Sequence, residues 1–272
     1  MKTLLALLAL ASSSFAGGLL DPSDKAIDEF TIDVEGRYWF ATLSGEIKAD
    51  TSIFTGSHID LVDELDFEEP VDPLIEGVLR ARMKKIQIRA AYFQVSWDET
   101  TRLEKTIRFK DLVFSASTIV EANATVRFGA LDAMFLIVDT GNSKEIGLEI
   151  GIGIGGRYLS FEGAIENALT GVDESISRTG IVPVVSVFAS VAFLNCFRID
   201  VEASGMKIPG FFPKIEGTFL DASIEARVYL VSFLYIAGGY RFILLDVEWD
   251  ASADVEFETR LQGFFVGAGI TF

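Results

Sequence analysis

The sequence predicts an all-β chain folded as a single antiparallel transmembrane β-barrel of about ten strands, with about eight or about twelve strands as alternatives. From residue 30 onward, segments with apolar and polar residues in alternation follow one another, separated by polar or glycine-containing stretches. The chain is 50% hydrophobic with a mean hydropathy of +0.36, although its formal net charge is -17. A barrel reconciles these values, because it presents apolar side chains to lipid and keeps charged ones in its lumen and loops.

The first residues have the pattern of an export signal. Met1 and Lys2 precede an apolar run from Leu4 to Leu10, and Ser14-Phe15-Ala16 forms a small-x-small cleavage site. The run is too short to span a bilayer. We therefore expect a signal peptide over residues 1–16, a periplasmic segment over 17–28 and the barrel over 29–272.

The first three predicted strands each have one apolar and one polar face. Outward-facing candidates are Phe30, Ile32, Val34, Tyr38 and Phe40, then Ile75, Leu79, Ala81 and Met83, then Ile86, Ile88, Ala90 and Tyr92. The opposite faces carry Thr31, Asp33, Glu35 and Arg37, then Glu76, Arg80 and Arg82, then Gln87 and Arg89. Lys84-Lys85 is predicted to be a tight turn between the second and third strands.

Two longer strands follow. Residues 118–138 place Val120, Ala122, Ala124, Val126 and Phe128 opposite Glu121, Asn123, Thr125 and Arg127, and they exceed the ~9–11 residues that cross a bilayer, so part is expected to project beyond it. After a turn at 139–143, Ile146, Leu148, Ile150, Ile152 and Ile154 alternate mostly with glycines, which leave room in the lumen for bulky neighbours.

Further strands are expected near 180–195, 197–204, 217–230, 233–247 and 253–272. Short turns fall near 84–85, 139–144, 195–196 and 231–232, and long loops near 46–73, 98–117, 163–179, 205–216 and 248–252, as expected for periplasmic turns and extracellular loops. The apolar stretch Ile181–Phe197 also allows a membrane helix, but Pro183 and the many valines favour a strand with Val182, Val184 and Phe188 inside.

The last predicted strand alternates up to the final residue, with Phe264, Val266, Ala268, Ile270 and Phe272 on one face. This ending resembles the closing strand of bacterial outer-membrane β-barrels: Gly267, Ile270 and Phe272 match its Gly-x-x-hydrophobic-x-aromatic pattern, although Phe265 stands where a polar residue is commoner. The resemblance implies that these three residues are an assembly signal. It also implies the outer membrane of a Gram-negative-type cell, with outer-membrane lipid and lipopolysaccharide, the barrel-assembly machinery and periplasmic chaperones as partners.

Charged residues on the predicted inner faces form the main candidate site. The principal members of this predicted lumen network are Glu35, Arg37, Arg80, Arg82, Arg89, Arg127, Glu149, Arg157, Glu225 and Arg227. The same reasoning adds Glu121, Arg198, Asp200, Glu202, Arg241, Glu256, Glu258 and Arg260. A lumen-crossing ion-pair network that rigidifies the barrel is the favoured interpretation, and a substrate-selective channel is the alternative. Trp97 and Trp249 are expected in aromatic girdles.

Other chemistry is sparse. His58 is the single histidine and lies in the first long loop, where a solvated side chain is the simplest expectation. The acidic run over 60–72 suggests a solvated loop, with a calcium site as the alternative, and its interleaved apolar residues suggest that it folds over the barrel mouth. We expect no catalytic residue, cofactor or metal, and no nucleic-acid partner, because the negative chain offers no basic stripe. The lone Cys196 cannot form an intramolecular disulfide.

The sequence thus predicts a non-enzymatic outer-membrane barrel that is either structural or a narrow conduit for small solutes, with a charge-filled lumen. Omptin proteases, the palmitoyltransferase and the phospholipase of the outer membrane resemble this chain in class, so a lipid-modifying or proteolytic enzyme remains an alternative. A surface adhesin is another.

Overall fold

The computed structural model describes residues 30–50, 55–67, 70, 73–140, 146–193, 196–208, 215–249 and 255–272. The expected signal peptide, residues 1–16, and the expected periplasmic segment, 17–28, lie outside these ranges.

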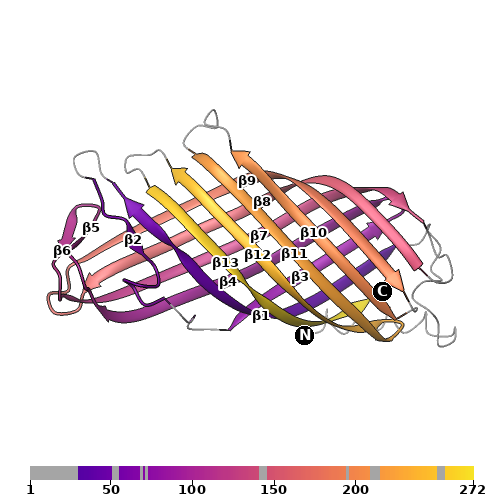
Figure 1. The fold of residues 1–272 in the computed structure, drawn as a ribbon, viewed down its shortest axis with the longest axis horizontal. Helices are drawn as coiled ribbons and strands as arrows, with labels where there is room; N and C mark the ends of the chain where they lie inside the picture. Colours follow the sequence, from indigo (N-terminus) through magenta and orange to yellow (C-terminus); the bar gives the residue numbers. More distant parts are fainter. Residues whose placement is uncertain are drawn as a thin grey trace, which may run out of the picture.

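Ten antiparallel strands form a closed barrel, as predicted. They are β1 (Thr31–Ala49), β3 (Leu74–Met83), β4 (Ile86–Arg102), β7 (Ile119–Asp139), β8 (Ile146–Asn167), β9 (Asp173–Phe193), β10 (Phe197–Ile208), β11 (Ile215–Val231), β12 (Leu234–Trp249) and β13 (Val255–Thr271). Each strand pairs with its neighbour in the chain, and β13 pairs with β1 from Asp33↔Thr271 to Ala49↔Val255. The strands are steeply tilted against the long axis (Figure 1).

The two ends of the barrel differ. At one end, here called the turn end, β3 is followed by β4, β7 by β8, β9 by β10 and β11 by β12, and the last residue of the chain lies there. The other, the loop end, carries β2 (Ile59–Asp60) and a small hairpin of β5 (Ile107–Phe109) and β6 (Leu112–Phe114), seen at the left of Figure 1.

The structure contradicts one expectation about a single segment and confirms another. The long loop expected at 163–179 is wrong, because β8 runs to Asn167 and β9 begins at Asp173. The region 181–197 forms strand, not helix, and Val182, Val184 and Phe188 are buried inside the barrel as expected. Among the described residues, no helix is long and apolar enough to cross a membrane.

The inner and outer faces of the barrel exchange polarity between the turn end and the loop end. On β7 near the turn end, Leu131 and Phe135 point outward with exposed fractions of 59% and 53%, while Asp132 points inward and is 2% exposed. On the same strand near the loop end, Val120 is buried inside and Glu121 is exposed outside. The turn-end half therefore has the surface of a membrane-embedded barrel. The loop-end half has an apolar interior and a polar exterior, as a water-soluble β-protein does.

An apolar plug fills the loop-end half. Its barrel residues include Trp39, Phe93, Trp97, Phe128, Phe161, Phe219, Leu245, Phe257 and Phe265. The first loop adds Leu61, Leu65 and Phe67, and the β5–β6 hairpin adds Ile107, Phe109 and Phe114. The interleaved apolar residues of the acidic loop thus fold over the barrel mouth, as their spacing suggests.

The girdle expectation for Trp97 is wrong. Its side chain is 3% exposed and stacks on Phe67 inside the plug, with 6.2 Å between ring centroids. Position 97 lies in the loop-end half, where the inner face is apolar, so an aromatic residue there is a core residue. The side chain of Trp249 lies outside the described part of the chain.

Candidate functional site

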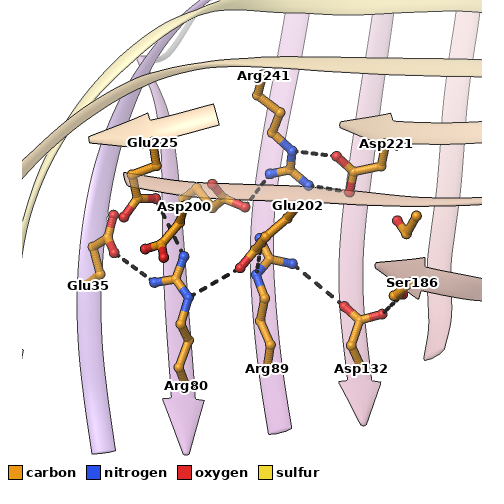
Figure 2. Close-up of polar contacts among 12 residues, drawn as sticks. Glu35, Arg80, Arg89, Asp132, Ser186, Asp200, Glu202, Asp221, Glu225 and Arg241 are labelled. Carbon is orange, nitrogen blue, oxygen red and sulfur yellow. Dashed lines mark hydrogen bonds and ion pairs between the residues drawn. The ribbon is translucent and has the colours of Figure 1, made fainter. Parts of the chain in front are cut away.

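Most of the charged side chains on the inner face of the turn-end half are almost completely buried. These residues, together called the central charge cluster, are Glu35, Arg37, Glu76, Arg80, Arg89, Asp132, Arg157, Asp200, Glu202, Asp221, Glu225, Arg227 and Arg241. They project into the lumen from β1, β3, β4, β7, β8, β10, β11 and β12, and Figure 2 shows part of the cluster. The period of two puts them there, because their neighbours along each strand are the apolar residues that point outward.

Arg37 lies at the centre of one half of this cluster. Its Nε donates to Glu35 at 2.6 Å, its Nη1 donates to Glu76 at 3.3 Å, and its Nη2 donates to Glu225. Arg80 donates to the other oxygen of Glu35 at 2.9 Å, and the hydroxyl of Tyr235 donates to that same oxygen at 3.0 Å. Glu35 is thereby held by three donor residues from three strands.

Arg157 and Asp132 organise the other half. Arg157 donates to Asp132 at 2.8 Å and to Ser204 at 2.6 Å, and Ser186 donates to Asp132 at 2.7 Å. Glycines on β8 permit this packing, since a Cβ at Gly155 would overlap the carboxylate of Asp132. The expectation that these glycines make room for bulky neighbours is therefore confirmed at this position.

Arg241 joins the charge cluster to the apolar plug. It donates twice to Asp221, at 2.9 and 2.8 Å (Figure 2). It also donates once to Glu76. Its guanidinium also lies 5.2 Å from the ring centroid of Phe128 and 5.4 Å from that of Trp39. A planar cation can satisfy carboxylates with its edge while its face stays against aromatic rings.

A smaller group of ion pairs lies nearer the turn end. Arg82 donates to Asp139 at 2.8 Å and to Glu149, and Arg198 donates to the other oxygen of Glu149 at 2.9 Å. The side chains of Arg82 and Arg198 are each 22% exposed, so this group, unlike the central cluster, reaches solvent.

Nine of the ten principal residues of the predicted lumen network lie in these two groups: Glu35, Arg37, Arg80, Arg82, Arg89, Glu149, Arg157, Glu225 and Arg227. The expectation for Arg127 is wrong. Its side chain points outward and pairs with Glu162 at 2.6 Å, with both side chains solvent-exposed in part. Glu121 and Glu258 are also exposed on the outer face.

The reason is the reversal of the two faces. Arg127 and Glu121 lie in the part of β7 beyond the lipid-facing belt, where polar residues face water on the outside. The rule that every charged strand residue points inward holds only within this belt, which is the lipid-facing part of the turn-end half. Glu256 and Arg260 share the outward parity of Glu258 on β13, and Arg260 packs over Phe242, so they too are outside the lumen.

Sequence reasoning missed three acidic members of the cluster: Glu76, Asp132 and Asp221. The alternation along the strand could have identified Asp132, because it lies between the apolar residues Leu131 and Ala133, with Phe135 further on, near the turn end. The alternation predicts Glu76 on the polar face of its strand, but its contacts with Arg37 and Arg241 depend on how the barrel closes.

The first loop holds the remaining candidates. Nδ1 of His58 lies 3.5 Å from Glu46, with side chains that are 61% and 53% exposed, so the pair faces solvent. Asp60 accepts hydrogen bonds from the backbone of Val62 at 2.9 Å and Asp63 at 2.8 Å, which makes it a turn residue. A hydrogen bond to Glu64 raises the pKa of Lys105.

No group of three metal-ligating side chains comes together within the described residues. Glu68, Glu69 and Asp72 of the acidic run lie outside them. The calcium alternative for this run has no support in the geometry of its described part.

No family model and no curated protein matches the sequence. The structure is similar to the outer membrane protease OmpT from Escherichia coli, with a TM-score of 0.52 and 12% identity over 92% of this chain and 100% of that one. Weaker similarity links it to Ail of Yersinia pestis (TM-score 0.34, 11% identity, 90% and 99% covered) and to the toluene transporter TodX of Pseudomonas putida (TM-score 0.29, 8% identity, 90% and 90% covered).

Proposed function

Because this chain has the fold of bacterial outer-membrane β-barrels, we propose that it is a non-enzymatic structural protein of the outer membrane with a closed lumen. Two layers in series support this. The central charge cluster crosses the lumen in the membrane-facing half, and the apolar plug fills the half beyond it. The single observation that carries the proposal is the near-complete burial of the cluster, with Arg157, Arg227 and Arg241 each at most 2% exposed.

The charge cluster opposes permeation for an energetic reason. A solute that passes must separate buried ion pairs, and removing one partner of such a pair costs roughly 3–5 kcal/mol. A barrel of about eight strands is just filled by side chains, whereas open aqueous channels need about sixteen. The narrow-conduit alternative would require side-chain rearrangement in both layers.

The enzyme alternative rests on weaker ground. The similarity to the protease OmpT is at 12% identity and concerns the fold. The exposed pair of His58 and Glu46 lies at the loop end, and the nearby Ser57 hydroxyl accepts a hydrogen bond from the backbone of Arg108 at 3.0 Å. A catalytic site needs a nucleophile or water held against a base, and these contacts do not assemble one.

Solute efflux from proteoliposomes tests the proposal. Vesicles loaded with a small sugar and a small anionic dye, and reconstituted with the purified full chain, are expected to release both no faster than protein-free vesicles. Rapid release of either solute would overturn the closed-lumen proposal and favour the conduit. The same preparation, incubated with peptide and phospholipid substrates, is expected to leave both intact.

Surface attachment through the loop end is a second candidate. One observation favours it: the first loop and the hairpin are fixed to each other, with Ser57 N donating to Arg108 O at 2.9 Å and Ile59 and Phe109 buried beneath them. Replacing residues 104–117 by a short Gly-Ser linker should abolish binding of bacteria to a host-cell or matrix surface while the barrel still inserts. Unchanged binding at equal surface display would remove this candidate.

The proposed location implies several partners. Outer-membrane lipid and lipopolysaccharide would contact the exposed apolar belt, and the barrel-assembly machinery and periplasmic chaperones would handle the chain before insertion. We propose no nucleic-acid partner.

A further inference from the structure

A small cavity lies inside the central charge cluster. Its volume is about 20 Å³. A water molecule needs about 10–15 Å³, so the cavity has room for one. Its lining is mostly polar and includes the side chains of Arg89, Asp132, Arg157, Glu202, Asp221 and Ser223.

Unpaired polar atoms point to an occupant. Nε of Arg157 and Oε1 of Glu202 have no hydrogen-bond partner among the described residues, although both atoms are buried. A buried polar atom without a partner is destabilising, so native proteins satisfy such atoms with protein groups or ordered water.

The distances within the ion pairs at and beside the cavity agree with this. Arg157 Nε lies 3.7 Å from Asp221, Arg89 Nη1 lies 3.7 Å from Asp132, and Arg80 Nε lies 3.6 Å from Glu202. Direct N–H···O hydrogen bonds measure about 2.7–3.2 Å. Three long pairs in one layer, two of them shown in Figure 2, mark a region where the charges are held together but not in direct hydrogen bonds.

We propose that this cavity is a hydration site holding one resident water, which accepts a hydrogen bond from Arg157 Nε and donates to the carboxylates of Glu202 and Asp221. The unpaired atoms include both a donor and an acceptor, which a neutral molecule with both functions can satisfy. Three carboxylates against two guanidiniums disfavour an anion, and the N–H of Arg157 disfavours a cation. The water joins the two halves of the central charge cluster, because Glu202 pairs with Arg80 and Arg89, and Arg157 pairs with Asp132.

The inference is independent of whether the lumen conducts, and it is tested at Arg157 itself. In the full chain labelled with ¹⁵N-arginine and folded in detergent micelles, the Nε–Hε signal of Arg157 is expected to show a direct cross-relaxation peak to water. The signal is assigned by its loss in Arg157→Lys. No such peak from the folded wild-type chain would overturn the proposal.

Variants at Ser223 supply a second readout. Ser223→Val fills the cavity without a polar group and should remove the water peak and lower the urea midpoint. Ser223→Ala leaves the space open and should retain both the peak and the midpoint. The exposed Ser177→Val on β9 controls for the effect of valine in a strand. A Ser223→Val midpoint above wild type would mean that valine fills a dry void, and it would refute the hydration site even where the NMR signal is weak.

Discussion

Arg241 on β12 and Asp221 on β11 form a bidentate ion pair, with both oxygens of the carboxylate accepting from the guanidinium at 2.9 and 2.8 Å. Arg241 is 1% exposed, and the face of its guanidinium packs against the aromatic rings of the apolar plug. This one side chain therefore links the charged and apolar layers that close the lumen.

Arg241→Lys should destabilise the barrel by about 1.5–3 kcal/mol, because an ammonium keeps the charge but loses the bidentate and stacked geometry. Urea unfolding in lipid vesicles measures the change. Arg127→Lys is the matched control, since its pair with Glu162 is outside the barrel and exposed, and it should leave the midpoint unchanged. Equal effects of the two substitutions would contradict the assignment of Arg241 as the junction.

Ile150→Arg on β8 should cost roughly 2–4 kcal/mol if the position lies near the bilayer midplane. Glu166→Arg, on the outward side of the same strand near the loop end, should cost nothing, because that part of the strand faces water. Reversible unfolding of both variants maps where lipid contact ends. A large loss at position 166 would show that lipid covers the loop-end half as well.

Gly155→Ala should destabilise the barrel by about 1–3 kcal/mol through overpacking. The added Cβ would overlap the carboxylate of Asp132 and lie 2.6 Å from the carbonyl oxygen of Leu131, so Asp132 must leave its place beside Arg157. At Gly156 the nearest atom to an added Cβ is on Ile181 at 3.8 Å, so Gly156→Ala should be tolerated. A tolerated Gly155→Ala would indicate that the cluster is looser than its contacts imply.

Phe272→Ser should reduce the yield of inserted barrel without affecting export, if the resemblance of the final strand to an assembly signal holds. The backbone of Phe272 pairs with Ile32 in both directions, at 2.9 and 3.2 Å, and these bonds survive the substitution, whereas its side chain is 52% exposed. Heat-modifiable migration on unboiled gels measures the inserted fraction. Refolding of the purified variant into vesicles should be normal, which separates a recognition defect from a stability defect.

Much of the fold follows from alternation. Ile150 and Glu149, or Leu79 and Arg80, are neighbours with opposite surroundings, and a period of two assigns each to its face wherever the strand crosses lipid. The count of ten strands and the charged lumen follow from the same pattern. The turns at 84–85 and near 232 follow from the breaks between the alternating segments.

The alternation does not reveal where the strand leaves the membrane. On β7 the outward residues change from Phe135 and Leu131 to Arg127 and Glu121, while the period stays the same. The apolar face changes from the outer to the inner side of the barrel at this point. A prediction from alternation alone therefore places Arg127 and Trp97 on the wrong side. Partners across the lumen, such as Glu76 and Arg241, lie 165 positions apart in the chain, and their pairing depends on barrel closure rather than on any local signal.

Single-channel recording in planar bilayers tests the closed lumen most directly. The wild-type chain is expected to give no stable current steps above the protein-free baseline, because the central charge cluster and the apolar plug both cross the lumen. Arg227→Gln removes a cation that contacts Glu225 and Asp200, and any leak that it introduces should be cation-selective. Stable, porin-sized conductance from the unmutated protein would contradict the account and make the barrel a diffusion channel.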